Sequence, residues 1–410
     1  MRAKLEHMHA NFYLYTNKAA LDHFFDSLYL AINKPMTCLQ FYALITPLSS
    51  QIKNGHSYIL PSGETRAWFN KHEVFLPLHI IWLDEKMFVD MNGSNDTTLK
   101  DGTQILSING MPAKDIMQAL LTRQVRDGYN ITYPTWILNN YFREYYSYIF
   151  GHPDRFVITY KHKGNAAAKT IVQALPKDSI SFYMHKKYAA RLPAPGEKAI
   201  TLTFNANNTI ATLTIKTFDD DDLKETYQQN FKTAIEDCFV QIKQHAITNL
   251  ILDLRNNQGG DPPNGIILLS YLLNNPFEMI HTGPMSVGTF QPVLNNAYSG
   301  ALYVLINGGS FSNTAMVSAC LARNKRGIFI GEETGGNQVM LTGDPETFTL
   351  PATKIDVEIA TVPYLLTGNP ALNNGHGVMP AYNVSPSILD IINNNDAVYN
   401  FAIALINKSK

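Results

Sequence analysis

The stretch that decides the fold is residues 301–336, with the sequence ALYVLINGGSFSNTAMVSACLARNKRGIFIGEETGG. Its first part, residues 302–306, is apolar, rich in β-forming residues and too short for a helix, so it predicts a buried strand. Small and polar residues follow, and small or apolar side chains then recur at helical spacing from Ala315 to Ala322. The stretch therefore predicts a strand, a sharp turn and a helix.

Ser312 lies where this turn becomes the helix. An isolated serine at such a position is most simply an N-cap, because its hydroxyl can accept from a free N–H group of the first turn. Gly308 and Gly309, however, allow a bend that presents the next side chains at the sheet edge, as the nucleophile turn of α/β hydrolases does. The helix N-terminus would also stabilise a developing negative charge. These features favour Ser312 as a nucleophile.

A second strand that ends in glycines covers residues 249–260. Leu250 to Leu254 predicts a buried strand, and Gly259 and Gly260 would let bare backbone approach a ligand closely. A glycine pair by itself is more often a tight turn than an anion site. This strand end is therefore only a candidate second source of N–H donors for the site.

Three motifs carry a resemblance to a known family: LDLRNNQGG at 252–260, GSFS at 309–312 and GEETGG at 331–336. Together, and in this order, they resemble the tail-specific (carboxy-terminal processing) serine protease family, which includes the tricorn protease core. The resemblance implies an α/β core of the ClpP/crotonase type. It implies no metal and no organic cofactor, and a protein or peptide as substrate. Members are usually exported, so it also suggests a periplasmic or secreted mature chain.

The resemblance further implies roles for individual residues of the site. Ser312 matches the nucleophile of the family, and the oxyanion hole would be formed by the N–H groups of the Gly259-Gly260 turn and of Asn313. The bacterial members that use a serine and lysine pair carry their lysine where this chain has Asn337. A neutral amide cannot act as a general base, so the serine and lysine mechanism fails at that position.

A histidine is the alternative base. Residues 51–57, QIKNGHS, resemble the motif that ends the helical N-terminal part in the tricorn-like branch, and they predict His56 as the general base. The unperturbed pKa of histidine suits proton transfer near neutral pH. Without the resemblance, a lone histidine in a Gly-His-Ser loop would be read as an ordinary surface or capping residue.

The residue that orients this histidine stays open. Tricorn-like members carry a glutamate just before a Gly-Val-x-Pro motif, but the matching stretch here, NNGHGVMP at 373–380, has no carboxylate. Glu332 or Glu333 could take the role, or Asn374 could orient the ring as amides do in some cysteine proteases. Both glutamates also fit solvated charges at a strand end.

Composition excludes several classes of protein. The chain has 410 residues with 33 basic and 34 acidic side chains, so nothing favours a nucleic-acid surface. Its three cysteines are widely spaced and are expected to be small buried hydrophobes, and the absence of a His-Glu-x-x-His motif disfavours a zinc hydrolase. No apolar run is long enough to predict a membrane span, and residues 1–15 lack the apolar core of a secretory signal.

The patterns predict a multi-domain α+β chain in three parts. A helical segment covers residues 1–57 and delivers His56, a β module with an aromatic helical insert covers 58–195, and the α/β core covers 196–410. Residues 99–110 resemble the strand and turn of a PDZ domain, a module that captures peptide tails by strand addition. The core is expected to hold strands at 199–204, 210–216, 249–254, 302–306 and 327–331, a helix at 222–244 and a hairpin at 348–350 and 354–359.

The sequence therefore predicts a serine endopeptidase that works through an acyl-enzyme, with Ser312 as nucleophile and His56 as base. The alternative is a catalytically inactive peptide- or lipid-binding homologue of the same fold. An esterase or lipase is disfavoured because the Gly-x-Ser-x-Gly motif is incomplete, with Thr314 in the place of its last glycine.

Overall fold

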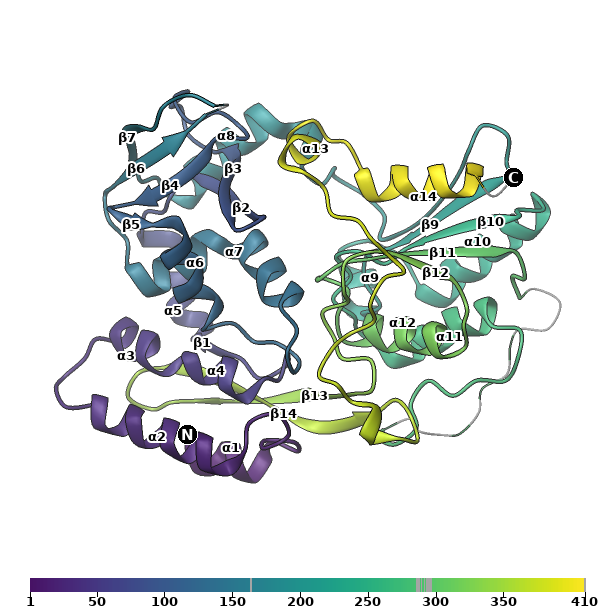
Figure 1. The fold of residues 1–410 in the computed structure, drawn as a ribbon, viewed down its shortest axis with the longest axis horizontal. Coiled ribbons are helices and arrows are strands. Elements are labelled where there is room, and N and C mark those ends of the chain that lie inside the picture. The colour runs from purple at the N-terminus through teal and green to yellow at the C-terminus, as the bar shows by residue number, and fades with distance from the viewer. Residues whose placement is uncertain (163, 285–287, 289, 291, 293–296, 409–410) are drawn as a thin grey trace.

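The computed structural model describes residues 1–408 except residue 163 and residues 285–287, 289, 291 and 293–296. Figure 1 shows three parts: N-terminal helices with a long hairpin at the lower left, a β module at the upper left and an α/β core at the right. Within the described residues, no helix combines the length and apolar character needed to cross a membrane.

The core is built on a six-stranded sheet with the strand order β15-β12-β11-β10-β9-β8. All neighbours in it are parallel except β8 and β9. Its strands are β8 (Ile200–Phe204), β9 (Ile210–Ile215), β10 (Asn249–Asp253), β11 (Ala301–Ile306), β12 (Ile328–Gly331) and β15 (Tyr382–Asn383). The predicted α/β class of this part is confirmed, and the assignment to the ClpP/crotonase type stays a prediction.

Helices cover both faces of this sheet, which explains why its strands are continuous apolar runs. The larger hydrophobic cluster joins strand residues such as Leu252 and Val304 to α10, α11 and α12, and a smaller one joins Ile251 and Leu305 to α14. The helices of the core are α9 (Asp220–Glu225), α10 (Phe231–Gln244), α11 (Pro262–Leu272), α12 (Asn313–Arg323), α13 (Ile388–Ile392) and α14 (Ala397–Lys408).

The middle module, residues 78–188, is a second mixed unit with its own core. Its sheet has the order β2-β3-β4-β6-β7, with β5 paired to β4. The elements are β2 (Leu78–Leu83), β3 (Lys86–Asn92), β4 (Gln104–Ile108), β5 (Met111–Pro112), α6 (Ala113–Leu121), α7 (Thr132–Phe150), β6 (Arg155–Lys161), β7 (Ala168–Gln173) and α8 (Lys177–Tyr188). The aromatic insert predicted from the sequence is helix α7.

The N-terminal helices pack on a hairpin that comes from the far end of the chain. Strands β13 (Met340–Thr349) and β14 (Ile355–Leu365) form this hairpin, and β1 (Ile59–Pro61) adds to its edge. Ile355, Val357 and Ile359 of β14 share one hydrophobic cluster with Leu5, Leu21 and Ile45. The helices are α1 (Arg2–Met8), α2 (Lys18–Ala31), α3 (Cys38–Ile45), α4 (Pro47–Ile52) and α5 (Gly63–His72).

Most predicted elements are present, but two differ in extent. The single helix predicted over residues 222–244 is two helices, α9 and α10, because Asp219 and Asn230 each cap a separate start. The hairpin predicted at 348–350 and 354–359 is much longer, because its outer residues gain their partners from each other and not from a local pattern. The division into domains at residues 57 and 195 stays a prediction.

Candidate active site

Ser312 lies at the start of α12 in a strained conformation. Its φ of 52° and ψ of −124° are unusual for a residue that is not glycine, and its side chain makes no capping hydrogen bond. The hydroxyl Oγ instead lies 3.0 Å from Nε2 of His56, although the two residues are 256 positions apart in the sequence. The structure thus brings together the two residues predicted as nucleophile and base.

The loop that carries His56 is held against the β13–β14 hairpin. Asn54 Oδ1 accepts from the main-chain N–H of His56 at 2.9 Å, and Asn54 Nδ2 donates to the carbonyl of Thr342 at 3.3 Å. On the other side of the histidine, the hydroxyl of Ser57 accepts from the N–H of Ala360 at 3.1 Å. The long hairpin therefore sets the position of the imidazole.

The environment of His56 favours its neutral form. Burial lowers the pKa of this histidine to about 4, while Asp344 and the main chain of Thr342 act in the opposite direction. A neutral imidazole can accept a proton from Ser312 through Nε2. The other ring nitrogen, Nδ1, is buried without a hydrogen-bond partner among the described residues.

An aromatic stack supports the face of the imidazole. The ring centroid of Phe311 lies 4.5 Å from that of His56 at an interplanar angle of 31°. Tyr133 of α7 stacks on Phe311 at 4.0 Å and 9°, and the Tyr133 hydroxyl is 2.6 Å from that of Tyr58. Because Phe311 directly precedes Ser312, this stack fixes the nucleophile turn and the imidazole against one another.

The predicted oxyanion donors divide into free and engaged N–H groups. Asn313 and Gly260 have main-chain N–H groups with no acceptor in the described part of the chain. The N–H of Gly259, in contrast, donates to Asn257 Oδ1 at 2.9 Å, so the structure contradicts its predicted role as a donor. Gly259 is needed for space instead, because a Cβ there would lie 2.8 Å from both Asn313 N and Ser312 Cβ.

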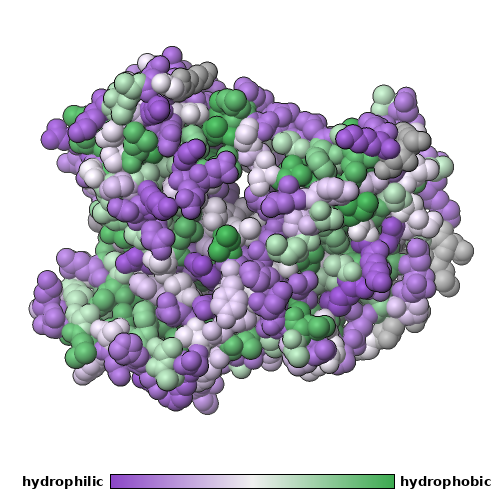
Figure 2. All heavy atoms as spheres, in the orientation of Figure 1, coloured by the Kyte–Doolittle hydropathy of each residue, from purple (hydrophilic) through white to green (hydrophobic). Residues whose placement is uncertain are grey.

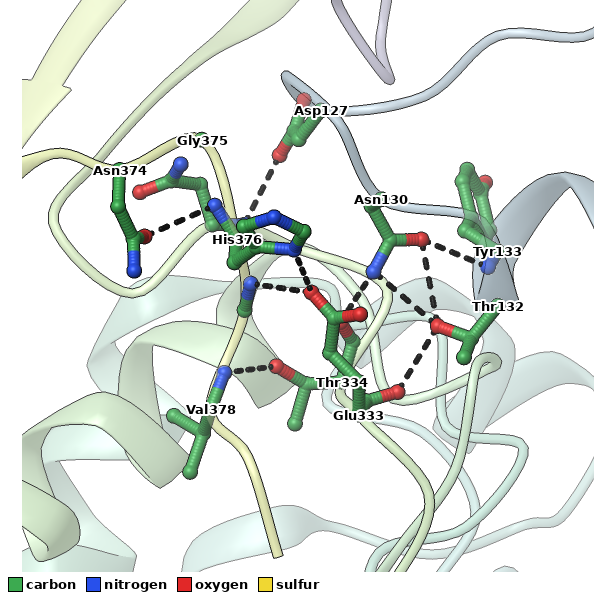
Figure 3. A network of polar contacts seen from close by, with 12 residues as sticks. Asp127, Asn130, Thr132, Tyr133, Glu333, Thr334, Asn374, Gly375, His376 and Val378 are labelled. Carbon is green, nitrogen blue, oxygen red and sulfur yellow. Dashed lines mark hydrogen bonds and ion pairs between the residues drawn. The ribbon is translucent and has the colours of Figure 1, made fainter.

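The predicted orienting carboxylates contact other groups (Figure 3). Glu333 is buried, and its Oε1 accepts from His376 Nδ1 at 3.0 Å and from the N–H of Gly377 at 2.8 Å. Glu332 accepts from the hydroxyl of Ser385 at 2.7 Å. Neither glutamate hydrogen-bonds to His56, so in this structure neither one orients the imidazole. The sequence pattern placed them near the site but could not show their partners.

The two amides considered from the sequence also have other roles. Asn374 Oδ1 accepts from the N–H of His376 at 3.1 Å and does not bond to His56. Asn337 is fully buried, and its side-chain oxygen accepts from the N–H of Val339 at 2.7 Å while its nitrogen donates to Tyr15 and Asn373. Asn337 therefore holds its own loop by a saturated set of hydrogen bonds.

Three residues at the site were missed by the sequence analysis. Phe311 supports the imidazole, Asp344 raises its pKa, and the buried carboxylate of Asp127 binds the N–H of Gly55 next to His56 at 2.7 Å. Asp344 has a φ of 46° and, with Thr361 opposite it, is left out of the pairing of β13 with β14, whose register is the same on both sides. Phe311 lies inside the motif at 309–312, but no local pattern marks the role of any of the three, because each acts on a partner far away in the sequence.

Two hollows lie in this part of the structure, and neither Ser312 nor His56 is among the residues that line them. A cleft of about 580 Å³ separates the middle module from the core, and Trp82, Trp136 and Asn256 are among its lining residues. Figure 2 shows the recessed surface between these two halves, with hydrophobic and hydrophilic residues mixed on both sides. A smaller, polar depression of about 350 Å³ lies against Gly259 and Gly260. No cluster of three or more metal-ligating side chains occurs among the residues that the structure describes.

A serine hydroxyl hydrogen-bonded to a histidine at a strained strand-to-helix turn is the arrangement of serine hydrolases. Residues 209–383 match the model of peptidase family S41. This range is less than half of the chain, and it is similar to peptidase family S41, a family of serine-type peptidases. This matched range contains Ser312 and the glycine turn, whereas His56 lies outside it.

Comparisons with individual proteins agree with the family. The chain is 27% identical over 119 residues to the chloroplastic C-terminal processing peptidase of Tetradesmus obliquus, and 28% identical over 114 residues to chloroplastic carboxyl-terminal-processing peptidase 2 of Arabidopsis thaliana. These matches cover 28% and 27% of this chain, and only 26% and 22% of the two relatives.

Solved structures show the same fold over nearly the whole chain. Mature CPAF in complex with lactacystin superposes with a TM-score of 0.69 at 15% identity, covering 99% of this chain and 96% of that structure. A protein described as a putative peptidase of Parabacteroides merdae superposes with a TM-score of 0.53 at 14% identity, covering 98% and 93%. At these identities the likeness concerns the fold alone.

Proposed function

We propose that this protein is a serine endopeptidase in which Ser312 is the nucleophile and His56 the general base. The observation that carries the proposal is the 3.0 Å contact between Ser312 Oγ and His56 Nε2 at a strained turn. A serine used only as a cap would not need this backbone conformation, which costs on the order of 1–3 kcal/mol. The similarity of residues 209–383 to peptidase family S41 supports the same reaction class.

The geometry supports a two-step acyl transfer. Ser312 Oγ attacks the scissile carbonyl while Nε2 of His56 takes the hydroxyl proton. The oxyanion of the tetrahedral intermediate would receive the N–H groups of Asn313 and Gly260. The imidazolium then gives the proton to the leaving amine, and the C–N bond breaks to leave an acyl-enzyme on Ser312 Oγ. In the second step water attacks the acyl carbonyl while His56 Nε2 takes a proton from it, and that proton passes to Ser312 Oγ as the ester bond breaks and the carboxylic acid leaves. The neutral His56 in the buried site is the form that this sequence requires at its start.

Proteins or peptides are the proposed substrates. The cleft between the middle module and the core is large enough for several residues of an extended chain, and it has apolar and hydrogen-bonding walls. The relatives from Tetradesmus obliquus and Arabidopsis thaliana are named for processing C-termini, which supports a substrate bound near its tail. An exported location, which was suggested by resemblance, stays part of the proposal.

Labelling with a fluorophosphonate tests the nucleophile directly. The wild type should react at Ser312 and hydrolyse peptides, and Ser312→Ala should lose both reactions while its thermal unfolding is unchanged. Ser318→Ala, in the same helix and with its hydroxyl bonded to the Thr314 carbonyl and to no other group of the described residues, is the matched control and should keep both. Labelling or hydrolysis retained in Ser312→Ala would remove this residue from the mechanism.

The alternative function is that of a peptide- or lipid-binding homologue without catalysis. The observation in its favour is the buried Nδ1 of His56, which has no carboxylate bonded to it among the described residues. A wild type that folds but reacts with neither the fluorophosphonate nor an activated ester would establish this alternative. A wild type that reacts at Ser312 would exclude it.

A further inference from the structure

We propose that Asp127 is a positioning residue that holds the loop of His56 in register with the loop beside Ser312. The inference rests on the proposed function, because it concerns the alignment of the same two residues. Asp127 belongs to the segment that precedes α7, and it touches neither reacting side chain. It acts through the two loops that its carboxylate joins.

Each oxygen of this carboxylate accepts from a different loop. Oδ1 accepts from the N–H of Gly55 at 2.7 Å, and Gly55 is the residue directly before His56. Oδ2 accepts from the N–H of Asn337 at 3.1 Å, across 210 positions of sequence. The side chain is only 3% exposed, so water cannot replace either bond. One carboxylate therefore ties the N-terminal part of the chain to the core.

The loop of Asn337 is itself packed against the nucleophile turn. The N–H of Gly335 donates to the carbonyl of Ser310 at 2.9 Å. A Cβ on Gly336 would lie 2.6 Å from Ala315 Cβ and 3.2 Å from Ser312 N, so this loop cannot shift without moving the turn. A continuous path of contacts thus runs from Ser312 through the 335–337 loop and Asp127 to His56.

The residues that follow Asp127 reinforce the same junction (Figure 3). The N–H of Gly128 donates to the carbonyl of Lys53 at 3.0 Å, and the N–H of Tyr129 donates to the carbonyl of Gly375 at 2.8 Å. Asn130 Nδ2 donates to the carbonyl of Thr334 at 3.0 Å. The loop before His56 is therefore hydrogen-bonded to the segment of Asp127 at both Lys53 and Gly55. Among these hydrogen bonds, the one to the Asp127 carboxylate involves Gly55, the residue directly before His56.

No cation pairs with Asp127 among the described residues, and burial raises its pKa to about 6. Of the groups around it, Tyr15, Tyr58 and Tyr133 have raised pKa values and stay neutral near pH 7, as does His9, whose pKa burial lowers to about 4. Lys53 and Arg126 keep their charge. Of the groups named here, Asp127 is thus the one whose charge changes between pH 5 and 7, and the His376–Glu333 pair beside Gly375 is common to the wild type and to Asp127→Asn.

Protonation of this carboxyl would break the junction, because two N–H donors need two acceptors and a carboxylic acid presents one of its oxygens as a donor. Asp127→Asn makes the same change permanently and keeps the shape of the side chain. We expect kcat and the rate constant of fluorophosphonate labelling to fall about 10- to 100-fold in this variant, with KM changed less than about twofold. Asp90→Asn is the control: Asp90 is equally buried but bonds to His79 and Arg191 of the middle module, and this variant should keep the wild-type kcat.

The pH dependence separates positioning from a general loss of structure. Wild-type labelling should rise as the pH passes upward through about 6, where Asp127 ionises, and Asp127→Asn should lack this step. The contribution of Asp127 to the unfolding free energy should change with pH in the opposite direction. The pKa of Asp127 is raised on folding, so its contribution to stability is complete below the unfolded value and falls as the pH rises toward 6. The difference between wild type and Asp127→Asn isolates this effect, because His9 and His56 titrate in both.

A crystal structure of Asp127→Asn provides a test that does not depend on activity. We expect the distance between His56 Nε2 and Ser312 Oγ to lengthen beyond hydrogen-bond range from its present 3.0 Å. A preserved contact, or a wild-type kcat in the variant, would overturn the inference while leaving the proposed function intact. A wild type that does not react at all would count against the proposed function, and the geometry of the variant would still decide the role of Asp127.

Discussion

Replacing Gly55 by alanine tests whether the position of the His56 loop controls the reaction. Gly55 is buried between the Phe311 ring and the Asp127 carboxylate. A Cβ at this position would lie 2.5 Å from Phe311 Cζ, 2.6 Å from Cε2 and 3.0 Å from Asp127 Oδ1. Real carbon atoms do not approach this closely, so either the loop or the ring must move by about 1 Å.

The two consequences of this movement have different sizes. Overpacking of a tight site costs about 1–3 kcal/mol of unfolding free energy, which a domain of ordinary stability tolerates. A displacement of about 1 Å between reacting groups costs roughly 100-fold in rate. We therefore expect Gly55→Ala to fold with a modestly lower melting temperature and to react with a fluorophosphonate about 100 times more slowly.

Chemical denaturation and labelling kinetics on the same preparation measure both effects. Gly63→Ala is the matched control, because a Cβ at the start of α5 meets no atom within 4 Å. This control should keep the wild-type labelling rate and gain slightly in stability. If Gly55→Ala labels as fast as Gly63→Ala, the loop is not held as tightly as the contacts imply and the reasoning is refuted.

Two further changes probe the neighbours of the pair. Phe311→Leu removes the ring that supports His56, so the rate of fluorophosphonate labelling should fall about tenfold. Phe239→Leu is the same change at a stacked and buried ring of α10, and it should lower the stability without changing the labelling rate. Equal labelling rates in the two variants would contradict the role of Phe311. Asn337→Lys introduces the lysine of the serine and lysine branch, but it buries a charge in place of an amide whose hydrogen bonds are all made. We expect the unfolding free energy, measured by chemical denaturation, to fall by about 3 kcal/mol or more. When His56 is also replaced by alanine, we expect no labelling. Labelling of that double variant would show that the lysine works as a base.

Short sequence patterns were enough to predict the local secondary structure around Ser312. The run of apolar residues, glycines and small residues around Ser312 produced β11, the turn and α12 as expected. Thr37 and Gln40 form the capping box that starts α3, within the predicted helical segment of residues 1–57. Such signals survive in a single sequence because the groups that satisfy them lie within a few residues of each other.

The differences from the prediction concern groups that have more than one possible hydrogen-bond partner. Glu333 was a plausible orienting acid by its position after β12, yet its carboxylate is taken by His376 and Gly377, 43 and 44 positions away. Gly259 was predicted to donate into the site, but its N–H is taken by the side chain of Asn257. A motif shows that a group is near a site, but it does not show which of several possible partners that group hydrogen-bonds.

The sequence by itself determined that a serine opens a helix after a turn at the end of a buried strand, and a family resemblance added the histidine that faces it. Only the tertiary structure decided how that histidine is held: by the β13–β14 hairpin, by the ring of Phe311 and by the carboxylate of Asp127. The reason is physical. Helix and strand formation depend on near neighbours along the chain, whereas a distance of 3.0 Å between side chains 256 residues apart depends on the packing of every segment between them.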